Sequence, residues 1–208
     1  MAERTKGLHW IVTVPALYTR IQSGLAGPQA KERIAHELFS GLENKRVVEI
    51  GCGPGLWSTN LQHAGSYVGV DRNERHIAAA NSRFGTPHTT FLCGDLADAG
   101  VIAAIGACDA VVAIGILHHL DDAVAKSVLA QSAALLRPNG VFIGLEPVYH
   151  DHQNPVARLL KWLDSGKDIR REEGYRSLFP KHLALETQVK TNLMRVPYSH
   201  ILIRGIMP

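Results

Sequence analysis

The chain has 208 residues, a length that fits one domain of ordinary size. Hydrophobic residues make up 46% and charged residues 20%, so a packed core is feasible and wholesale disorder is excluded. The 22 basic and 19 acidic residues leave a formal charge of +3 without a dense basic stripe, so we expect no nucleic-acid partner.

Cysteine usage and hydropathy exclude two further classes. Three cysteines without a CxxC pair form neither a disulfide framework nor a zinc ribbon. The longest apolar run, Ala110 to Leu117, is far shorter than the ~20 residues that a bilayer span needs. The N-terminus has no apolar stretch typical of a signal peptide. We therefore expect a cytoplasmic protein with no membrane partner.

Short apolar runs alternate with amphipathic stretches along most of the chain. The pattern predicts strands at 46–50, 66–70, 88–93, 109–114 and 141–145. Between and before them it predicts helices at 28–42, 56–64, 73–84, 98–105 and 121–136, the last ending in a tight turn at 137–140. This alternation is typical of βαβ units and predicts a parallel sheet covered on both faces. Two late runs, 183–191 and 199–206, predict an antiparallel hairpin at the sheet edge.

A glycine-rich loop, Gly51 to Gly55, follows the first predicted strand and is expected to open a helix that offers free N–H groups. Acidic residues stand at the ends of three successive strands: Glu49, Asp71 and Asp95. Ligands of open α/β sheets bind at the carboxyl ends of the strands, so these carboxylates indicate one crevice, with Asp71 placed to accept from ribose hydroxyls. The alternative is that Asp71 and Asp95 are helix N-caps.

Two cofactors compete for such a crevice. A dinucleotide loop has the spacing G-x-G-x-x-G, whereas the third glycine here, Gly55, comes one residue early. Glu49 beside the loop would also repel a pyrophosphate. The loop therefore favours a ligand that carries positive charge.

Five ordered motifs carry a resemblance: VVEIGCGPG, YVGVD, FLCGDLAD, DAVVAIGILHHL and LLRPNGVFIGLEP. Over Val47 to Pro147 the chain resembles class I S-adenosylmethionine-dependent methyltransferases, with a methyltransferase domain of the 11/25 type. The resemblance implies an α/β, Rossmann-like, doubly wound sheet of seven strands with strand seven antiparallel. It also implies helices on both faces and a small helical lid.

The resemblance assigns residues to S-adenosylmethionine and its product S-adenosylhomocysteine. It implies that the methionine moiety is lined by Glu49, Gly51, Cys52, Gly53 and Gly55. The ribose would be held by Asp71 with Arg72 beside it, the adenine would meet Asp95 and Leu96, and Ile114 would supply backbone against the amino-acid part. Vaguer similarity of both chain ends to small bacterial methyltransferases of small molecules would place Tyr18 near the cofactor.

Candidate catalytic groups follow strands four and five. A general base is needed if the acceptor must lose a proton early, and histidine suits that role near neutral pH. His119, next to His118, ends the fourth predicted strand, and Tyr149 and His150 follow the fifth. The alternatives are a histidine buried under the next helix and a solvated loop. His150 and His152 also have the spacing of metal ligands, but no third ligand is identifiable, so we expect no metal.

Polar residues further along the chain also bear on the substrate. Arg170 and Arg171 either clamp an anionic group of the substrate or form a surface pair beside Glu172. Tyr198 and His200 share one face of the last predicted strand and could reach the pocket.

We therefore expect one domain, 1–208, with an N-terminal helical cap (1–45), a cofactor-binding core (46–146), a helical insertion (147–180) and a C-terminal hairpin (181–208). The expected activity is methyl transfer to a small organic acceptor, with oxygen favoured over nitrogen or carbon. Two other classes stay open: an NAD-dependent oxidoreductase, and a cofactor-binding module without catalysis. The sequence does not indicate an oligomeric state.

Overall fold

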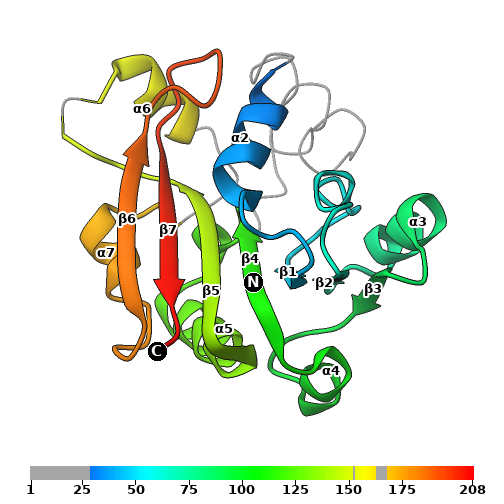
Figure 1. Cartoon of the computed structure of the whole chain (residues 1–208). Coiled ribbons are helices and arrows are strands. Elements are labelled where there is room, and N and C mark those ends of the chain that lie inside the picture. The colour runs from blue at the N-terminus through cyan, green and yellow to red at the C-terminus, as the bar shows by residue number, and fades with distance from the viewer. Residues whose placement is uncertain (1–28, 152, 163–167) are drawn as a thin grey trace.

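The computed structural model describes residues 29–151, 153–162 and 168–208. Its strands form a seven-stranded sheet in the order β3-β2-β1-β4-β5-β7-β6 (Figure 1). The strands are β1 (Arg46–Ile50), β2 (Ser66–Asp71), β3 (Thr89–Cys93), β4 (Cys108–Ile114), β5 (Leu136–Pro147), β6 (Ala184–Lys190) and β7 (His200–Ile206). The α-helices are α2 (Ala30–Phe39), α3 (Glu74–Phe84), α4 (Ala99–Ile105), α5 (Asp122–Leu135), α6 (Pro155–Trp162) and α7 (Glu172–Arg176).

Strand pairing confirms the predicted fold class. The first five strands pair in parallel, and β7 is antiparallel to both β5 and β6. The predicted late hairpin therefore forms. β7 lies between β5 and β6, and β6 is the edge strand of the sheet. The chain reverses its order between β1 and β4, which is where doubly wound sheets bind their ligands.

Alternation along the strands explains the layers. Val47 packs with α2 and α3 on one face, while the next residue, Val48, packs with α4 and α5 on the other. Tyr175 of α7 joins the α5 layer, where its hydroxyl donates to the carbonyl of Pro147 at 2.8 Å. The sheet is thus covered on both faces, as its continuous apolar strands require.

The helix predicted over 56–64 is wrong. The segment forms a series of turns with one short 3-10 helix, η2 (Ser58–Asn60). The hydroxyl of Ser58 donates to the carbonyl of Gly55 at 2.7 Å, and that of Thr59 to Leu56 at 3.3 Å. Such side chains compete with the helical hydrogen-bond pattern, so the local polarity outweighs the apolar spacing.

The predicted turn at 137–140 instead lies within β5. Leu136 pairs with Cys108 and Val141 with Ala110, so extra residues of β5 bulge between these two pairs. Asn139, in this bulge, has φ +62°, a left-handed conformation that asparagine tolerates.

The insertion after β5 contains α6 and α7. Figure 1 shows α6 at the end of the sheet where β4 and β6 finish, whereas α7 lies beside the sheet. Of the two helices of the predicted insertion, α6 is therefore the one at the carboxyl edge of the parallel strands. In the described ranges, none of the helices combines the length and apolar character needed to cross a membrane.

Candidate active site

The glycine loop turns the chain away from the sheet directly after β1. Gly51, Gly53 and Gly55 have φ of +68°, +52° and +75°, in the left-handed region that favours glycine. Gly51 and Gly55 are also confined by packing. An added Cβ would lie 2.3 Å from Ile116 Cδ1 at Gly51, and 2.7 Å from the Phe91 ring at Gly55.

Gly53 differs, because a Cβ there would point into space that the described residues leave open. The nearest atom to that Cβ is His76 Nδ1 at 4.0 Å. No packing in the described structure therefore demands glycine at this position. The space beside this Cβ adjoins Asp71, whose carboxylate accepts from the Gly53 N–H at 2.8 Å. We call this part of the loop, bordered by Asp71 and His76, the cradle.

The N–H groups of this loop are already hydrogen-bonded. Those of Gly51 and Cys52 both donate to the carbonyl of Val70, at 2.8 and 3.1 Å, and that of Gly55 donates to Cys52 at 3.0 Å. The expectation of free N–H groups at a helix start is wrong, because the loop is tied to the end of β2 and no α-helix follows it. The loop therefore lacks the donor array that binds a pyrophosphate.

Glu49 adds a buried carboxyl beside the loop. It is 2% exposed, and the Tyr67 hydroxyl donates to its Oε2 at 2.6 Å. Burial raises the pKa of Glu49 to about 7, the Tyr67 hydrogen bond opposes this rise, and the nearby Asp71 adds to it. The site can thus hold a negative charge near neutral pH when a cationic group neutralises it.

Stability should depend on Glu49 in a defined direction. The unfolded chain ionises Glu49 near the ordinary value of 4.5, while the folded protein keeps the proton up to about pH 7. The free energy of unfolding should therefore fall as pH rises across this window. We expect Glu49→Gln to exceed the wild type by about 1–3 kcal/mol at pH 8, and to match it near pH 4.5, in urea unfolding.

The control for this prediction is Glu43→Gln, which alters an exposed carboxylate. It should leave the pH dependence of unfolding as in the wild type. An unchanged pH dependence in Glu49→Gln would show that Glu49 is not the group that titrates.

Asp71 and Asp95 lie at the carboxyl ends of β2 and β3, but neither is a helix N-cap. Asn73 caps α3 and Asp98 caps α4. Asp71 accepts from the backbone of Gly53 and Asn73, and its side chain is 17% exposed. Asp95 pairs with Arg72 at 3.3 Å on the surface.

The remaining residues assigned to the cofactor divide between core and surface. Leu96 is buried in the core at 5% exposure, and Cys52 is also buried, which raises the pKa of its thiol well above the ordinary range. Ile114 is half-buried at the end of β4, followed by Gly115 with φ +65°. Tyr18 lies outside the described residues.

The segment after β4 is held by a buried carboxylate that the motif analysis did not single out. Glu146 is fully buried and accepts from the N–H groups of Ile116 and Leu117 at 2.9 and 2.8 Å. Its Oε2 also lies 2.7 Å from His118 Nδ1. These bonds fix the 3-10 helix η3 (Leu117–His119).

His118 is thus a buried structural histidine, as one alternative predicted. His119 is half-buried, and its ring lies 4.1 Å from the His118 ring. Both histidines thus lie just after β4, close to the end of β5.

Arg170 has partners within the fold for its guanidinium. Its guanidinium donates to the carbonyls of Leu117 at 2.9 Å and Leu120 at 2.7 Å, and pairs with Asp122 at 2.8 Å. The side chain is 10% exposed, and its N–H donors hold the turn after β4. Arg171 differs, because it lies at the surface and pairs with Asp151 at 2.8 Å.

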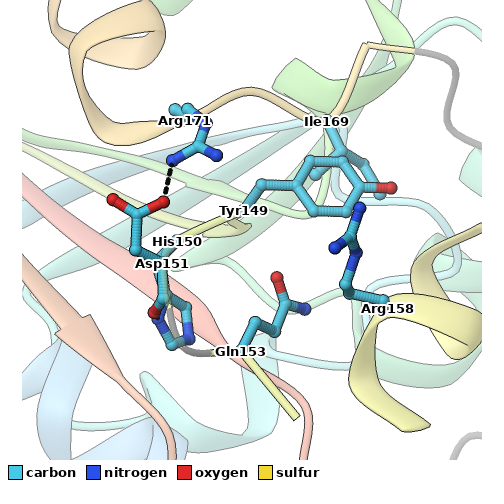
Figure 2. Close-up of a pocket in the computed structure, with 7 residues that line it drawn as sticks. All are labelled: Tyr149, His150, Asp151, Gln153, Arg158, Ile169 and Arg171. Carbon is cyan, nitrogen blue, oxygen red and sulfur yellow. Dashed lines mark hydrogen bonds and ion pairs between the residues drawn. The ribbon is translucent and has the colours of Figure 1, made fainter. Parts of the chain in front are cut away.

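A cavity of about 530 Å³ opens just beyond the end of β5 (Figure 2). Its lining comes from the loop after β5, from α6 and from the approach to α7: Tyr149, His150, Asp151, Gln153, Arg158, Ile169 and Arg171. The volume suits a small organic molecule. Two of the three candidate catalytic residues, Tyr149 and His150, therefore share a pocket, whereas His119 is not among the described residues of its lining.

His150 is held by both ring nitrogens. Nδ1 lies 2.6 Å from the carbonyl of Asp151, which only accepts, so Nδ1 carries the proton in the neutral ring. Nε2 lies 2.9 Å from the Ser199 hydroxyl and is then the basic nitrogen. This arrangement suits a proton acceptor whose tautomer is fixed.

Tyr149 is positioned by a buried lysine that sequence reasoning missed. Lys161 of α6 is 1% exposed, donates to the carbonyl of Val148, and lies 5.4 Å from the Tyr149 ring and 5.3 Å from the Tyr198 ring. Burial lowers its pKa to about 8. No local pattern marks this role, since Lys161 reads as an ordinary polar position of an amphipathic helix.

The remaining predictions concern His200 and metal binding. His200, at the start of β7, is 9% exposed and lies 5.1 Å from the Tyr198 ring, while His152 is outside the described residues. Within the described ranges, we find no group of three side chains arranged to hold a metal ion.

Comparison with known proteins follows this geometry. Residues 47–140 match the family described as "Methyltransferase domain". Over this segment the chain is similar to methyltransferase domains. The match covers β1 to the bulge of β5 and so includes the glycine loop, Asp71 and Asp95.

Curated relatives are methyltransferases of several kinds. An uncharacterised chloroplastic methyltransferase of Arabidopsis thaliana is 30% identical over 59% of this chain and 37% of its own length. An uncharacterised methyltransferase of Mycobacterium tuberculosis is 29% identical over 58% and 59%. The ubiquinone biosynthesis O-methyltransferase of Aromatoleum aromaticum is 34% identical over 49% and 43%. The chain thus spans less than two thirds of the length of these relatives.

Solved structures are similar in fold over nearly the whole chain. A Haloferax volcanii methyltransferase, in complex with the Trm112 methyltransferase activator, has a TM-score of 0.70 at 17% identity, covering 96% of this chain and 94% of its own. The N-methyltransferase NodS of Bradyrhizobium japonicum, in complex with S-adenosylhomocysteine, has a TM-score of 0.65 at 16% identity, covering 98% and 93%.

Proposed function

We propose that this chain transfers the methyl group of S-adenosylmethionine to a small organic acceptor. The observation that carries the proposal is the open cradle at Gly53, between Asp71 and His76 and beside the buried Glu49. The acidic surroundings suit the positively charged sulfonium and amino groups of S-adenosylmethionine. The engaged N–H groups of the loop argue against a dinucleotide, and so against the oxidoreductase alternative.

In this proposal the cofactor and the acceptor occupy two neighbouring sites at the carboxyl edge of the sheet. Gly51, Cys52, Gly53 and Gly55 would line the methionine part, and Asp71 would accept from the ribose. Ile114, Asp95 with Arg72, and Leu96 would complete the cofactor site. When bound, S-adenosylmethionine supplies an activated methyl group. The chain's own task is to place the acceptor in line and exclude water, which recovers ~7–11 kcal/mol in well-oriented reactions.

The acceptor would enter the cavity beyond β5. Tyr149 and His150 line it, α6 stands at the same edge, and His150 has a basic nitrogen of fixed tautomer. A base of this kind suits an acceptor that loses a proton, and oxygen is the favoured accepting atom. The relatives named ubiquinone biosynthesis O-methyltransferases support oxygen, while the name of the structural neighbour NodS keeps nitrogen as the second candidate.

The test of the cofactor site is Asp71→Ala. Removing a charged acceptor from two ribose hydroxyls should raise the Kd for S-adenosylmethionine about ten- to a hundredfold, as measured by calorimetry. Unchanged affinity in a folded variant would contradict the role of Asp71.

The matched control is Asp109→Ala. Asp109 also accepts from a backbone N–H, that of Arg46 at 2.7 Å, but it lies at the opposite end of the sheet. Its loss should lower stability and leave affinity unchanged. Binding of NADH rather than S-adenosylmethionine by the wild type would overturn the proposed function, and binding without methyl transfer to any phenol, carboxylate, amine or nucleoside would favour the non-catalytic alternative.

A further inference from the structure

We infer that the cavity beyond β5 binds an acceptor that carries an anionic group, a carboxylate or a phosphate, with Arg158 as its counter-charge. The inference rests on the proposed function, since it names the class of molecule that receives the methyl group. It depends on three features of the cavity lining: its charge balance, a buried amide without a partner, and the position of the cavity relative to β5.

The charge balance of the cavity is positive. Arg158 and Arg171 both line it, and Asp151 is the carboxylate among the described lining residues. Asp151 pairs with Arg171 at 2.8 Å, so one cation is neutralised at the rim. The guanidinium of Arg158 has no hydrogen-bond or ion-pair partner in the described part of the chain. Its charge is therefore available to a ligand, and guanidinium binds carboxylate or phosphate with paired hydrogen bonds.

Gln153 indicates that the ligand is polar at a second point. Both polar atoms of its side chain, Oε1 and Nε2, are shielded from solvent and have no hydrogen-bond partner among the described residues. Figure 2 shows the amide directed toward the cavity between His150 and Arg158. Buried polar groups in native proteins are nearly always paired, so this amide marks a place where a ligand supplies the partner.

The two groups together restrict the ligand further. The amide offers one acceptor and two donors, whichever way its oxygen and nitrogen are assigned. An anionic oxygen shared between Arg158 and one amide N–H, with a hydroxyl or amine that donates to the amide oxygen, would give both polar atoms of the amide a partner. Ile169 and the Tyr149 ring leave apolar surface for the body of the molecule. The geometry thus favours a small acid with a neighbouring protic group.

The cavity is also placed to receive a methyl acceptor. It begins two residues after β5 ends, and β5 lies directly beside β4, whose carboxyl end borders the proposed cofactor site. Arg158 comes from α6 and Gln153 from the loop that precedes it, so the insertion supplies the groups that recognise the acid. The cofactor core supplies none of them.

The experiment uses the full chain saturated with S-adenosylhomocysteine, titrated with two matched pairs of probes. The pairs are benzoate with benzamide, and phenyl phosphate with phenol. We expect at least one charged probe to bind tenfold or more tightly than its neutral partner, and to weaken at higher salt. In Arg158→Gln this preference should fall to less than threefold, while Arg83→Gln, which removes an exposed arginine of α3, should leave it unchanged.

Two outcomes would overturn the inference. One is equal affinity, or no binding, for the charged and neutral members of both pairs. The other is a preference for the charged probe that Arg158→Gln does not reduce. Gln153→Leu gives an independent arm, because it should weaken the charged probe tenfold or more without altering S-adenosylhomocysteine affinity. Failure of S-adenosylhomocysteine itself to bind would overturn the proposed function instead, so the two failures are distinguishable.

Discussion

Gly53→Val is expected to abolish S-adenosylmethionine binding, with a Kd raised more than a hundredfold in calorimetry. The side chain would occupy the open space beside Asp71 and His76. Valine also resists the φ of +52° at this position, so the loop would shift or strain to accommodate it. The sheet should stay intact, because the new Cβ would meet only His76 Nδ1, at 4.0 Å, among the residues that the structure describes.

The strain of a β-branched residue at positive φ must be separated from loss of the cradle. Gly106→Val provides this control, since Gly106 has φ +68° and nothing within 4 Å of an added Cβ. It ends α4, where it lies far from the carboxyl edge of the sheet. Both variants should lose similar stability, and only Gly53→Val should lose the cofactor. Retained binding in Gly53→Val would mean that the loop only connects β1 to the turns that follow it.

The second large effect concerns the proposed base. His150→Ala should lower kcat by ~10²–10⁴ with cofactor affinity nearly unchanged, if the acceptor loses a proton during transfer. The wild-type rate should be lower in acid than near neutral pH, because a protonated imidazole cannot accept a proton. The measurement is a labelled-methyl transfer assay with an acceptor found by screening.

Two further variants make this prediction specific. Ser199→Ala removes the hydroxyl 2.9 Å from Nε2 but keeps the imidazole, so it should retain most of kcat. His119→Ala tests the other candidate, at the end of β4. A rate independent of pH between about 5 and 9, with both histidine variants active, would exclude a histidine base. Transfer would then depend on proximity alone, as for an acceptor that is already ionised.

The sequence by itself determined the sheet and the place of the glycine loop within it. Apolar runs that end in Gly51, Asp71 and Asp95 predict parallel strands whose carboxyl ends meet, and pairing of β1 with β2 and β2 with β3 confirms that arrangement. The strand prediction succeeds because a strand buried on both faces is a continuous apolar run, which can be recognised from the local sequence. The positions of the loops then follow from the order of the strands. The helix predicted over 56–64 is wrong because side-chain hydroxyls there compete for backbone carbonyls. The spacing of apolar residues does not reveal such competition.

Only the tertiary structure decided which polar residues are free to act. Arg170 and Arg171 are neighbours in sequence, yet the first is spent on carbonyls after β4 and the second lines a cavity. His118 is bound to Glu146, whereas His150 keeps a basic nitrogen beside Ser199. Gln153, Arg158 and Lys161 carry no motif, and their environments come from folding the insertion back onto β5 and β7. Side-chain availability is set by partners distant in the chain, so residue type and spacing alone do not determine it.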